Sequence, residues 1–597
     1  MQICSIGVTS RPGVDKGGLP FDVKALPSEW NRDWNGGENR MLNFSDAPIP
    51  ATFLLKGPSA TCAGLQLVVD IPAELEIKDA CCPFGPVFEP LKPSATPFVT
   101  NGTDYVRYVF ENAKVFGVLN ETSYNADVAQ GIMLTLGPKP GGEKTEKAFR
   151  IFYHMSQNGQ NGTGKSMVMA FRPMPTNLRI SKDFKVFSWN SSDRHFATDA
   201  AALAAFRAYE AAGLSSFRKT SNGKKPFPRQ KELSALLSKR PVKYIFSGRF
   251  SDVWAAGHVG FFDAAMREKF GVRMAESCDE NDERFARGKM CPEYFINDLK
   301  FRDYLRQRIH GVLAAGDVAD GDWVTFDMEP WHPLTWCHCD ACHKSFAAYA
   351  KLDHVPTAKE ILTPELTDKW ADFRCWHNLK SVEVLTTIIR EFNPTLQCVD
   401  YDYVMPYGDE EGMKARRRRV GKDTLRNEQW LDGHLCSYYH CIDREAFETI
   451  RNNTRHLKRF YVPMAAIAGA GGYLRPGEVL SPRQIRQFAL AAFVNGCRGY
   501  AFYAGVCYDG EILQAMMEAQ DLIARYEGLP WGKKDGSAAP TCASKSFAFA
   551  STVRPDGSEV VALFNYDVQD SIDVSLDGST FTIAPYDVRF VTRNPAK

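Results

Sequence analysis

Apolar and polar residues alternate in short segments through the first 180 residues of the chain. Residues 63–70, 105–110 and 148–153 follow this pattern, and Gly, Pro and Asn residues separate such segments. Alternation with a period of two is typical of strands with one buried face, and frequent turns between short strands favour a sandwich of two sheets. The sequence therefore predicts an N-terminal β-sandwich over residues 1–180, without helices.

The pattern changes near residue 181, where short apolar segments begin to alternate with helical ones. The helical pattern is clearest over residues 199–213, which a capping residue opens and Gly213 closes, and over residues 301–315. Eight strand–helix units over residues 181–534 predict a (β/α)8 TIM barrel. An open doubly wound sheet is the alternative, but no Gly-rich phosphate loop follows any strand. The strand candidates are residues 185–189, 214–218, 243–247, 323–327, 396–400, 433–437, 459–463 and 499–503.

The last segment of the chain, residues 535–597, returns to the pattern of strands. Residues 546–551, 559–565 and 588–592 are the strand candidates, and they predict a small C-terminal β-sandwich. The expected fold class is therefore a multidomain α/β protein, in which two β-domains flank the barrel.

The composition excludes several classes of partner. With 72 basic and 71 acidic residues the net charge is +1, which gives no electrostatic reason to expect nucleic acid. No apolar run is long enough to predict a membrane span. The first residues read as a strand and not as a signal peptide. A trimmed signal would imply a secreted or periplasmic protein, and otherwise we expect a cytoplasmic one. Association of copies of the chain is left open.

Two carboxylates follow an apolar segment that begins at Trp323. Asp327 and Glu329 are two positions apart, so on a strand they point to the same face. Barrel enzymes hold their acids and bases at the carboxyl ends of strands, and glycoside hydrolysis requires an acid and a second carboxylate. We expect Glu329 to be the acid, with a structural ion pair as the alternative. Asp327 either raises the pKa of Glu329 by repulsion or orients an N-acetyl group of the substrate.

The second carboxylate is expected from the fifth predicted strand. Asp400 and Asp402 again share a face, and Asp402 is nearer the carboxyl end. Asp402 is therefore expected to act as the base of an inverting mechanism, about 6.5–9.5 Å from Glu329. Binding of sugar hydroxyls is the alternative role for Asp402.

Aromatic and polar residues gather after the predicted strand ends. A pyranose ring packs its C–H face on a flat aromatic ring, while its hydroxyls require polar partners. These residues are therefore the expected contacts of a carbohydrate substrate: Trp189, Arg249, Trp331, His332, Tyr403, Tyr438, Tyr503 and Asp509.

A compact cysteine motif lies just beyond Glu329. Cys337, Cys339 and Cys342 form a C-x-C-x-x-C run, which predicts a tetrahedral zinc site with a fourth ligand from elsewhere. Cys291 is the expected fourth ligand, and free or disulfide-bonded cysteines are the alternative. Four thiolates leave no open position on the metal, so the zinc is expected to be structural. The competing fourth ligands are Cys278, His338 and His343.

The cysteines and the preceding glutamate resemble a known family. Cys291 followed by Pro, and the C-x-C-x-x-C run eight positions after Glu329, are similar to the zinc site of family 42 β-galactosidases. Residues 475–478 and 487–496 resemble the same family's segment between strands seven and eight. This resemblance covers only residues 280–510 and implies a glycosidase with a (β/α)8 barrel. Two positions depart from the family, since Met328 replaces an Asn and residues 459–466 contain no nucleophilic Glu.

The sequence thus predicts a glycoside hydrolase that acts on an oligo- or polysaccharide. A catalytically inactive, carbohydrate-binding barrel is the alternative, because the seventh strand lacks an acid. A zinc hydrolase is disfavoured, since no H-E-x-x-H helix is present and the expected ligands are all sulfur.

Overall fold

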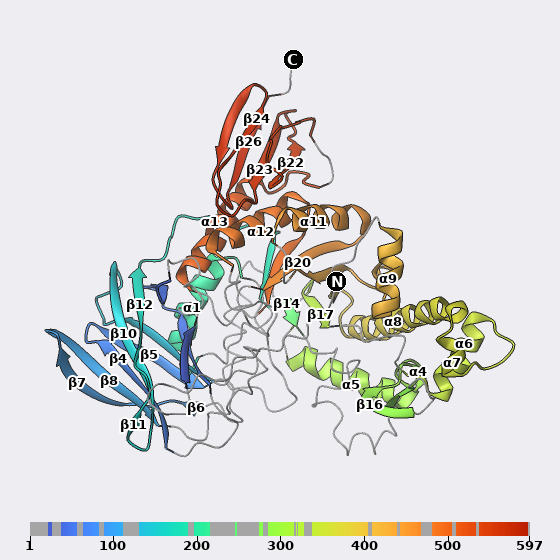
Figure 1. The fold of residues 1–597 in the computed structure, drawn as a ribbon, viewed down its shortest axis with the longest axis horizontal. Helices are drawn as coiled ribbons and strands as arrows, with labels where there is room; N and C mark the ends of the chain where they lie inside the picture. Colours follow the sequence, from blue (N-terminus) through green and yellow to red (C-terminus); the bar gives the residue numbers. More distant parts are fainter. Residues whose placement is uncertain are drawn as a thin grey trace.

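The computed structural model describes residues 22–26, 37–56, 64–82, 89–111, 131–188, 196–214, 245–247, 274–278, 284–315, 318, 320–327, 337–403, 409–438, 442–466, 480–503, 509–532 and 536–594. Figure 1 shows three parts: β-sheets from the N-terminal third at the left, a parallel sheet with helices in the centre and at the right, and a β-rich C-terminal part at the top.

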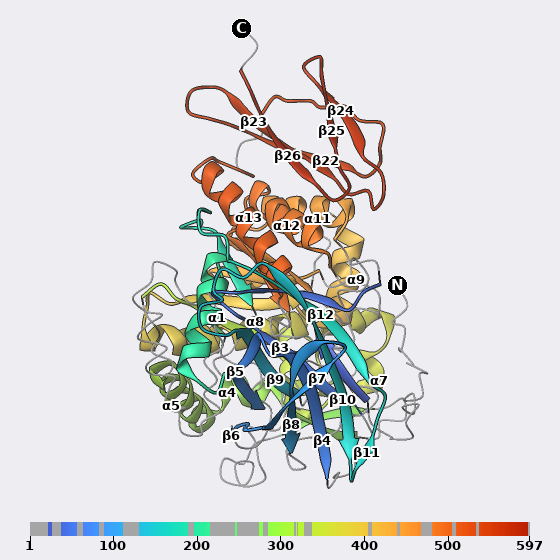
Figure 2. The ribbon, with the colours of Figure 1, turned by 90° about the vertical axis from the view of Figure 1, so that its left-hand side faces the viewer.

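The N-terminal third contains two β-sheets that share one core. Apolar residues from both sheets, such as Phe53, Leu67, Leu134 and Ile151, form a single buried cluster. Two sheets with one core are what the alternation of this region predicts, and no described residue from 22 to 188 is helical. Figure 2 faces this side of the molecule. The first sheet has the order β1 (Asp22–Leu26), β3 (Pro50–Lys56), β9 (Gly131–Pro138), β5 (Leu75–Cys82) and β6 (Glu89–Pro90). The second has the order β2 (Arg40–Phe44), β12 (Lys165–Arg172), β10 (Lys147–Gln157), β4 (Leu65–Pro72), β8 (Thr103–Glu111) and β7 (Ser94–Thr100), and β11 (Gln160–Asn161) pairs with β10.

The central sheet has seven strands, and every pair of neighbours is parallel. The strands of this sheet are arranged in their order along the chain, except that the first strand lies beside the last. Leu214, where a further strand is predicted, forms a parallel bridge with Val186 on the first strand. The sheet order is β13 (Lys185–Ser188), β21 (Gly499–Tyr503), β20 (Phe460–Ala466), β19 (Gly433–Ser437), β18 (Gln397–Tyr403), β17 (Trp323–Asp327) and β14 (Ile245–Ser247).

The two faces of the parallel sheet have different neighbours. One face carries a compact apolar cluster, which we call the inner face. The opposite face, which we call the outer face, contributes Val324 and Cys398 to the core that includes α5 and α8. It contributes Tyr461 and Tyr500 to the core that includes α11, α12 and α13. The residues of the inner face are Phe187, Trp323, Val399, Tyr401, Leu435, Val462, Met464 and Ala501.

Helices cover the outer face of the sheet. The predicted helix over 199–213 is confirmed, although Thr198 and not Asp199 is its N-cap, and Gly213 follows its end with a φ of 78°. The predicted helix over 301–315 begins two residues earlier than expected. The helices are α1 (Asp199–Ala211), α4 (Pro292–Asn297), α5 (Leu299–Ala315), α6 (Asp340–Ala350), α7 (Ala358–Ile361), α8 (Pro364–Phe392), α9 (Glu410–Val420), α10 (Thr424–Asn427), α11 (Arg444–His456), α12 (Pro482–Val494) and α13 (Gly510–Tyr526).

Two hairpins were not predicted from the sequence. One consists of β15 (Met274–Cys278) and β16 (Arg284–Met290), which leads directly into Cys291. The other consists of β24 (Ile572–Leu576) and β25 (Ser579–Ile583) in the C-terminal part.

The C-terminal sheet packs on both of its faces. It has the order β22 (Phe547–Val553), β23 (Glu559–Asn565) and β26 (Val588–Arg593). Val561 and Leu563 pack against the β24–β25 hairpin, whereas Val560 and Phe564 join the core that includes α11, α12 and α13. Figure 2 shows this sheet above those three helices. None of the described helices is long and apolar enough to cross a membrane.

Candidate functional site

The four predicted metal-binding cysteines lie together in a buried group. Cys291 directly follows β16 and is the N-cap of α4, while Cys339 is the N-cap of α6. Cys342 lies in the first turn of α6, and Cys337 precedes that helix. The ligand atoms of all four residues lie within 4.8 Å of one another, and each side chain is buried. The sequence motif is thus brought together with the distant Cys291 as expected.

The sulfur spacing fits a tetrahedral thiolate site. The Sγ atom of Cys291 lies 3.5 Å from that of Cys339 and 3.7 Å from that of Cys342, and the Sγ atoms of Cys337 and Cys339 are 3.6 Å apart. A zinc–sulfur bond of about 2.3 Å gives a tetrahedron with edges of about 3.8 Å. These separations also exceed the S–S bond length of about 2 Å, so the cysteines are not disulfide-bonded. The group can therefore hold a metal ion.

The local backbone supports ligand binding at this group. Cys337 has a φ of 49°, a left-handed conformation that is uncommon for a residue other than glycine and that clusters at ligand clamps. Burial raises the pKa of the Cys337 and Cys342 thiols, whereas hydrogen bonds from Cys291 and the other thiols lower the pKa of Cys339. Metal binding requires the thiolate form, so a bound cation would offset the burial that disfavours this form.

Two of the other proposed fourth ligands, His338 and His343, lie outside the group. His338 Nδ1 is 3.1 Å from His343 Nε2, and the His338 ring stacks on Trp370 with centroids 4.9 Å apart. Both histidines are buried and belong to this aromatic stack instead of the sulfur cluster. Cys278 lies on β15, and its side chain is outside the described part of the chain.

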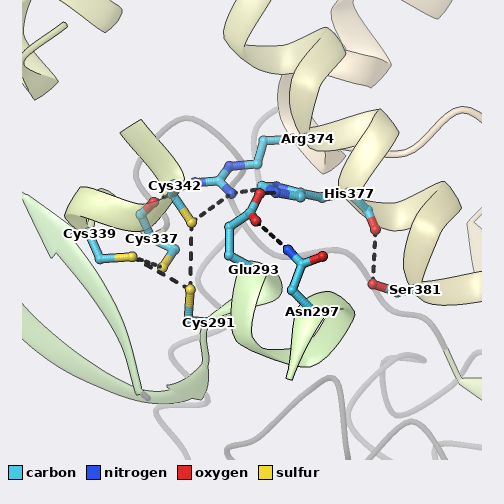
Figure 3. A network of polar contacts seen from close by, with 9 residues as sticks. All are labelled: Cys291, Glu293, Asn297, Cys337, Cys339, Cys342, Arg374, His377 and Ser381. Atoms are coloured by element: carbon cyan, nitrogen blue, oxygen red, sulfur yellow. Dashed lines mark hydrogen bonds and ion pairs between the residues drawn. The ribbon is translucent and has the colours of Figure 1, made fainter. Parts of the chain in front are cut away.

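A polar network extends from the cysteines into α8 (Figure 3). Arg374 Nη1 donates to Cys342 Sγ at 3.8 Å, and Arg374 Nη2 donates to the carbonyl oxygen of Cys337 at 2.6 Å. Arg374 Nη1 also lies 2.9 Å from His377 Nδ1, and His377 Nε2 lies 2.6 Å from Glu293 Oε1. The sequence analysis missed these three residues, although the i, i+3 spacing of Arg374 and His377 puts them on one face of a helix.

The two carboxylates expected to carry the chemistry lie at the end of β17 or just beyond it. Asp327 is the last residue of that strand, and its side chain is outside the described residues. Glu329 also lies outside them. Trp323, four positions before Asp327, belongs to the inner face.

Asp400 has a buried ionic environment on the outer face of β18. Its carboxylate lies 2.9 Å from Lys422 Nζ and 2.8 Å from His434 Nδ1, and all three side chains are fully buried. Burial alone would raise the pKa of Asp400, but Lys422 and His434 lower it to about 2. This pairing favours a structural role for Asp400. Asp402 is the next residue but one on β18, and its side chain is not described.

Two of the predicted sugar contacts are buried and engaged in structural contacts. Tyr438 Oη lies 2.7 Å from Tyr461 Oη, and Asn453 Nδ2 donates to both hydroxyl groups. Asp509 caps α13 by accepting from the backbone of Ile512 at 2.9 Å. These positions favour structural roles for Tyr438 and Asp509.

The remaining predicted contacts have no described side chain. Tyr403 and Tyr503 are the last residues of β18 and β21, so both stand at the carboxyl edge of the parallel sheet. Four further residues lie outside the described part of the chain: Trp189, Arg249, Trp331 and His332.

Comparison with known proteins gives distant structural neighbours. No family model and no curated protein matches the chain. Similar solved structures include a cold-adapted β-galactosidase from Rahnella sp. R3 with 12% identity, a TM-score of 0.40 and coverage of 59% of this chain and 57% of that one. A GH42 β-galactosidase from G. stearothermophilus has 10% identity, a TM-score of 0.40 and coverage of 60% and 58%. A family 39 glycoside hydrolase from Bacteroides cellulosilyticus WH2 has 8% identity, a TM-score of 0.37 and coverage of 93% and 96%.

The chain spans less than three fifths of the length of the two β-galactosidases. These neighbours include the family that the cysteine motif resembles, although each TM-score is below 0.5.

Proposed function

We propose that this protein is a glycoside hydrolase whose catalytic carboxylates stand at the carboxyl edge of the parallel sheet. The observation that carries the proposal is the position of Asp327 at the last residue of β17, with Glu329 two residues further on. Acids at carboxyl strand ends are typical of barrel enzymes. Glu329 would protonate the leaving oxygen of a glycosidic bond as the general acid.

The order of the parallel strands supports a closed (β/α)8 barrel. The first strand pairs with the last, and the bridge between Val186 and Leu214 lies where the expected second strand would begin beside the first. Closure then requires only that the strand at Leu214 also meets β14. We infer a barrel over residues 181–534, with β-sandwiches over residues 1–180 and 535–597.

The identity of the second carboxylate depends on which face of the sheet carries the reaction. Asp402 was predicted to share a face with Asp400, and Asp400 faces the helices. Asp327 lies four positions after Trp323 on β17, so alternation puts both on the same face of the sheet, and Trp323 belongs to the inner face. This alternation favours Asp327 as the partner of Glu329, in a substrate-assisted mechanism that retains the anomeric configuration. The inverting scheme with Asp402 as base is the competing proposal, and the anomer of the product separates the two.

The four cysteines would hold a structural zinc ion. The donor set is all sulfur, the separations fit a tetrahedron, and the burial of every ligand excludes a substrate position. Bound zinc would supply folding energy and would hold the segment between β17 and α6 in place. In this proposal the carboxylates carry out the reaction, and the zinc ion has only a structural role.

A catalytically inactive, carbohydrate-binding barrel is the second candidate function. The β20 segment favours it, because Phe460–Ala466 contains no acid where the resembled family has its nucleophile. The test is incubation of the full chain with a panel of oligo- and polysaccharides, with measurement of both released reducing ends and retention in affinity electrophoresis. Release of reducing ends supports the hydrolase, whereas retention without release supports the binding protein.

A further inference from the structure

A permanent cation is buried beside the cysteine group. Arg374 lies on α8 with only 3% of its surface exposed. Its guanidinium contacts the sulfur of Cys342 and the carbonyl oxygen of Cys337, and it lies 4.1 Å from the ring centroid of Trp370. Figure 3 shows the guanidinium between the sulfur atoms and His377. A buried guanidinium therefore touches two of the four cysteines.

The orientation of Arg374 is fixed from its other side. An arginine can only donate, so His377 Nδ1 must accept from Arg374 Nη1, and the imidazole proton lies on Nε2. That proton is directed at Glu293 Oε1 at 2.6 Å, and Asn297 donates to the other carboxylate oxygen of Glu293 at 2.7 Å. Glu293 and Asn297 belong to α4, the helix that Cys291 caps. The relay thus connects α8 to the helix that carries one of the cysteines.

The charge of Arg374 requires a negative partner. A buried cation is costly unless nearby negative charge compensates it. The carboxylate of Glu293 reaches Arg374 only through His377, whereas four thiolates around a divalent cation would add a net charge of −2 in direct contact with the guanidinium. A nitrogen donor on a ligating sulfur also fixes the ligand's orientation, as do the outer partners of metal ligands in general.

We propose that Arg374 is a positioning residue of the metal centre, which compensates the charge of a divalent tetrathiolate site and orients Cys342 through its N–H···S contact. This inference rests on the proposed zinc centre. Arg374 touches the sulfur and carbonyl of the ligands and no reacting atom, so its effect is on metal binding. His377 and Glu293 hold the guanidinium in this geometry.

The test compares four forms of the full chain: wild type, Arg374→Met, Arg374→Lys and the control Arg390→Met. Arg390 lies on the same helix and pairs with Asp432 at 3.1 Å, so its loss removes an arginine and an ion pair without touching the cysteines. Zinc affinity is measured by competition with a chromophoric chelator. The thiolate-to-metal charge-transfer band is recorded with cobalt(II) in place of zinc.

We expect Arg374→Met to weaken zinc binding by about 10- to 100-fold, the usual effect of losing an outer partner of a metal ligand. Its cobalt band should move to longer wavelength, because a thiolate that loses an N–H donor gives up electrons more readily. Arg374→Lys keeps the charge and should recover part of the affinity. The control should match wild type in both measurements.

Equal affinity and an unchanged band in Arg374→Met and the control would overturn the inference. If Arg374→Met does not fold, Arg374→Lys and His377→Gln decide the matter, and wild-type values in both would overturn it equally. A wild-type chain that binds neither zinc nor cobalt would refute the proposed zinc centre itself, and the inference with it. If the wild type and the variants at residue 374 bind metal equally well, the zinc centre is supported but the proposed role of Arg374 is refuted.

Discussion

Phe187 on β13 is the register partner of Ala501 on β21, and both side chains belong to the inner face of the parallel sheet. The first and last strands of the sheet are therefore hydrogen-bonded neighbours. In a closed barrel the strand succession ends where it began, and this pair has that relationship. Because neighbouring strands are parallel, their carboxyl ends lie at one edge of the sheet, where Asp327, Tyr403 and Tyr503 end their strands.

Purified protein should contain one zinc ion per chain. Cys337→Ser should lose the metal and unfold at a lower temperature, because the folding energy of a structural site comes from its ligands. Metal analysis and thermal unfolding of wild type and variant check this prediction. Cys497→Ser changes a buried cysteine outside the group and should keep its zinc. Absence of metal from the wild type, or full zinc content in Cys337→Ser, would contradict the proposed centre.

The ionic group around His434 predicts a loss of stability at alkaline pH. Burial alone would lower the pKa of His434, but the carboxylates of Asp400 and Glu428 raise it from 6.5 to about 9, and Lys422 is the other charged group that faces Asp400. A folded-state pKa above the unfolded value means that the native state holds the proton more tightly. The stabilisation is therefore complete below about pH 6.5 and is lost as the pH rises through about 9.

Urea unfolding between pH 6 and pH 10 measures this effect. The midpoint of the wild type should fall across that window, whereas His434→Gln should start lower and fall less. His456→Gln removes an exposed histidine of α11 and should follow the wild type. Parallel pH profiles for the wild type and His434→Gln would show that His434 does not carry the dependence.

Tyr438→Phe should affect stability and leave substrate affinity unchanged. The hydroxyl of Tyr438 pairs with Tyr461 and Asn453 on the helix-facing side of the sheet. Its removal leaves buried polar groups with fewer partners, which costs about 1 kcal/mol. Chemical denaturation measures the loss, and KM for any substrate found should match that of the wild type. A raised KM with unchanged stability would instead support the sugar contact that the sequence predicted.

The first-formed anomer of the product separates the two carboxylate schemes. Retention is expected if Asp327 orients an N-acetyl group of the substrate for attack on the anomeric carbon, because two successive inversions restore the configuration. Inversion is expected if Asp402 activates water from the opposite face of the sugar. Proton NMR of the reaction within the first minutes, before mutarotation, reports the configuration. An inverted product would return the role of the second carboxylate to Asp402.

Much of the fold could be predicted from hydrophobic periodicity. The strand at residues 323–327 and the strand at residues 559–565 were predicted with their observed bounds, because both are short apolar segments with clear polar flanks. The β15–β16 hairpin was missed because its strands contain several charged or polar residues and lack a clear alternation. The β24–β25 hairpin turns at Asp577 and Gly578, a turn pair that gives a usable signal for a hairpin.

The site was predicted less evenly than the fold. The spacing of the cysteines is a local signal, and it found three members of the group directly and Cys291 by its Cys-Pro context. The positions of Asp400 and Tyr438 could not be predicted, because alternation says which residues share a face and not which face is turned to the helices. Arg374 and Lys422 were missed because a buried cation becomes recognisable only through partners that are distant in sequence.

The most direct test of the proposed hydrolase is the activity of Glu329→Gln. The substitution keeps the shape of the side chain and removes the proton that a general acid must supply. On a substrate with a poor leaving group we expect turnover to fall by about 10²- to 10⁴-fold relative to wild type, while the unfolding temperature stays the same. The matched control Glu391→Gln alters an exposed glutamate of α8 and should keep full activity. Wild-type turnover in Glu329→Gln would contradict the account.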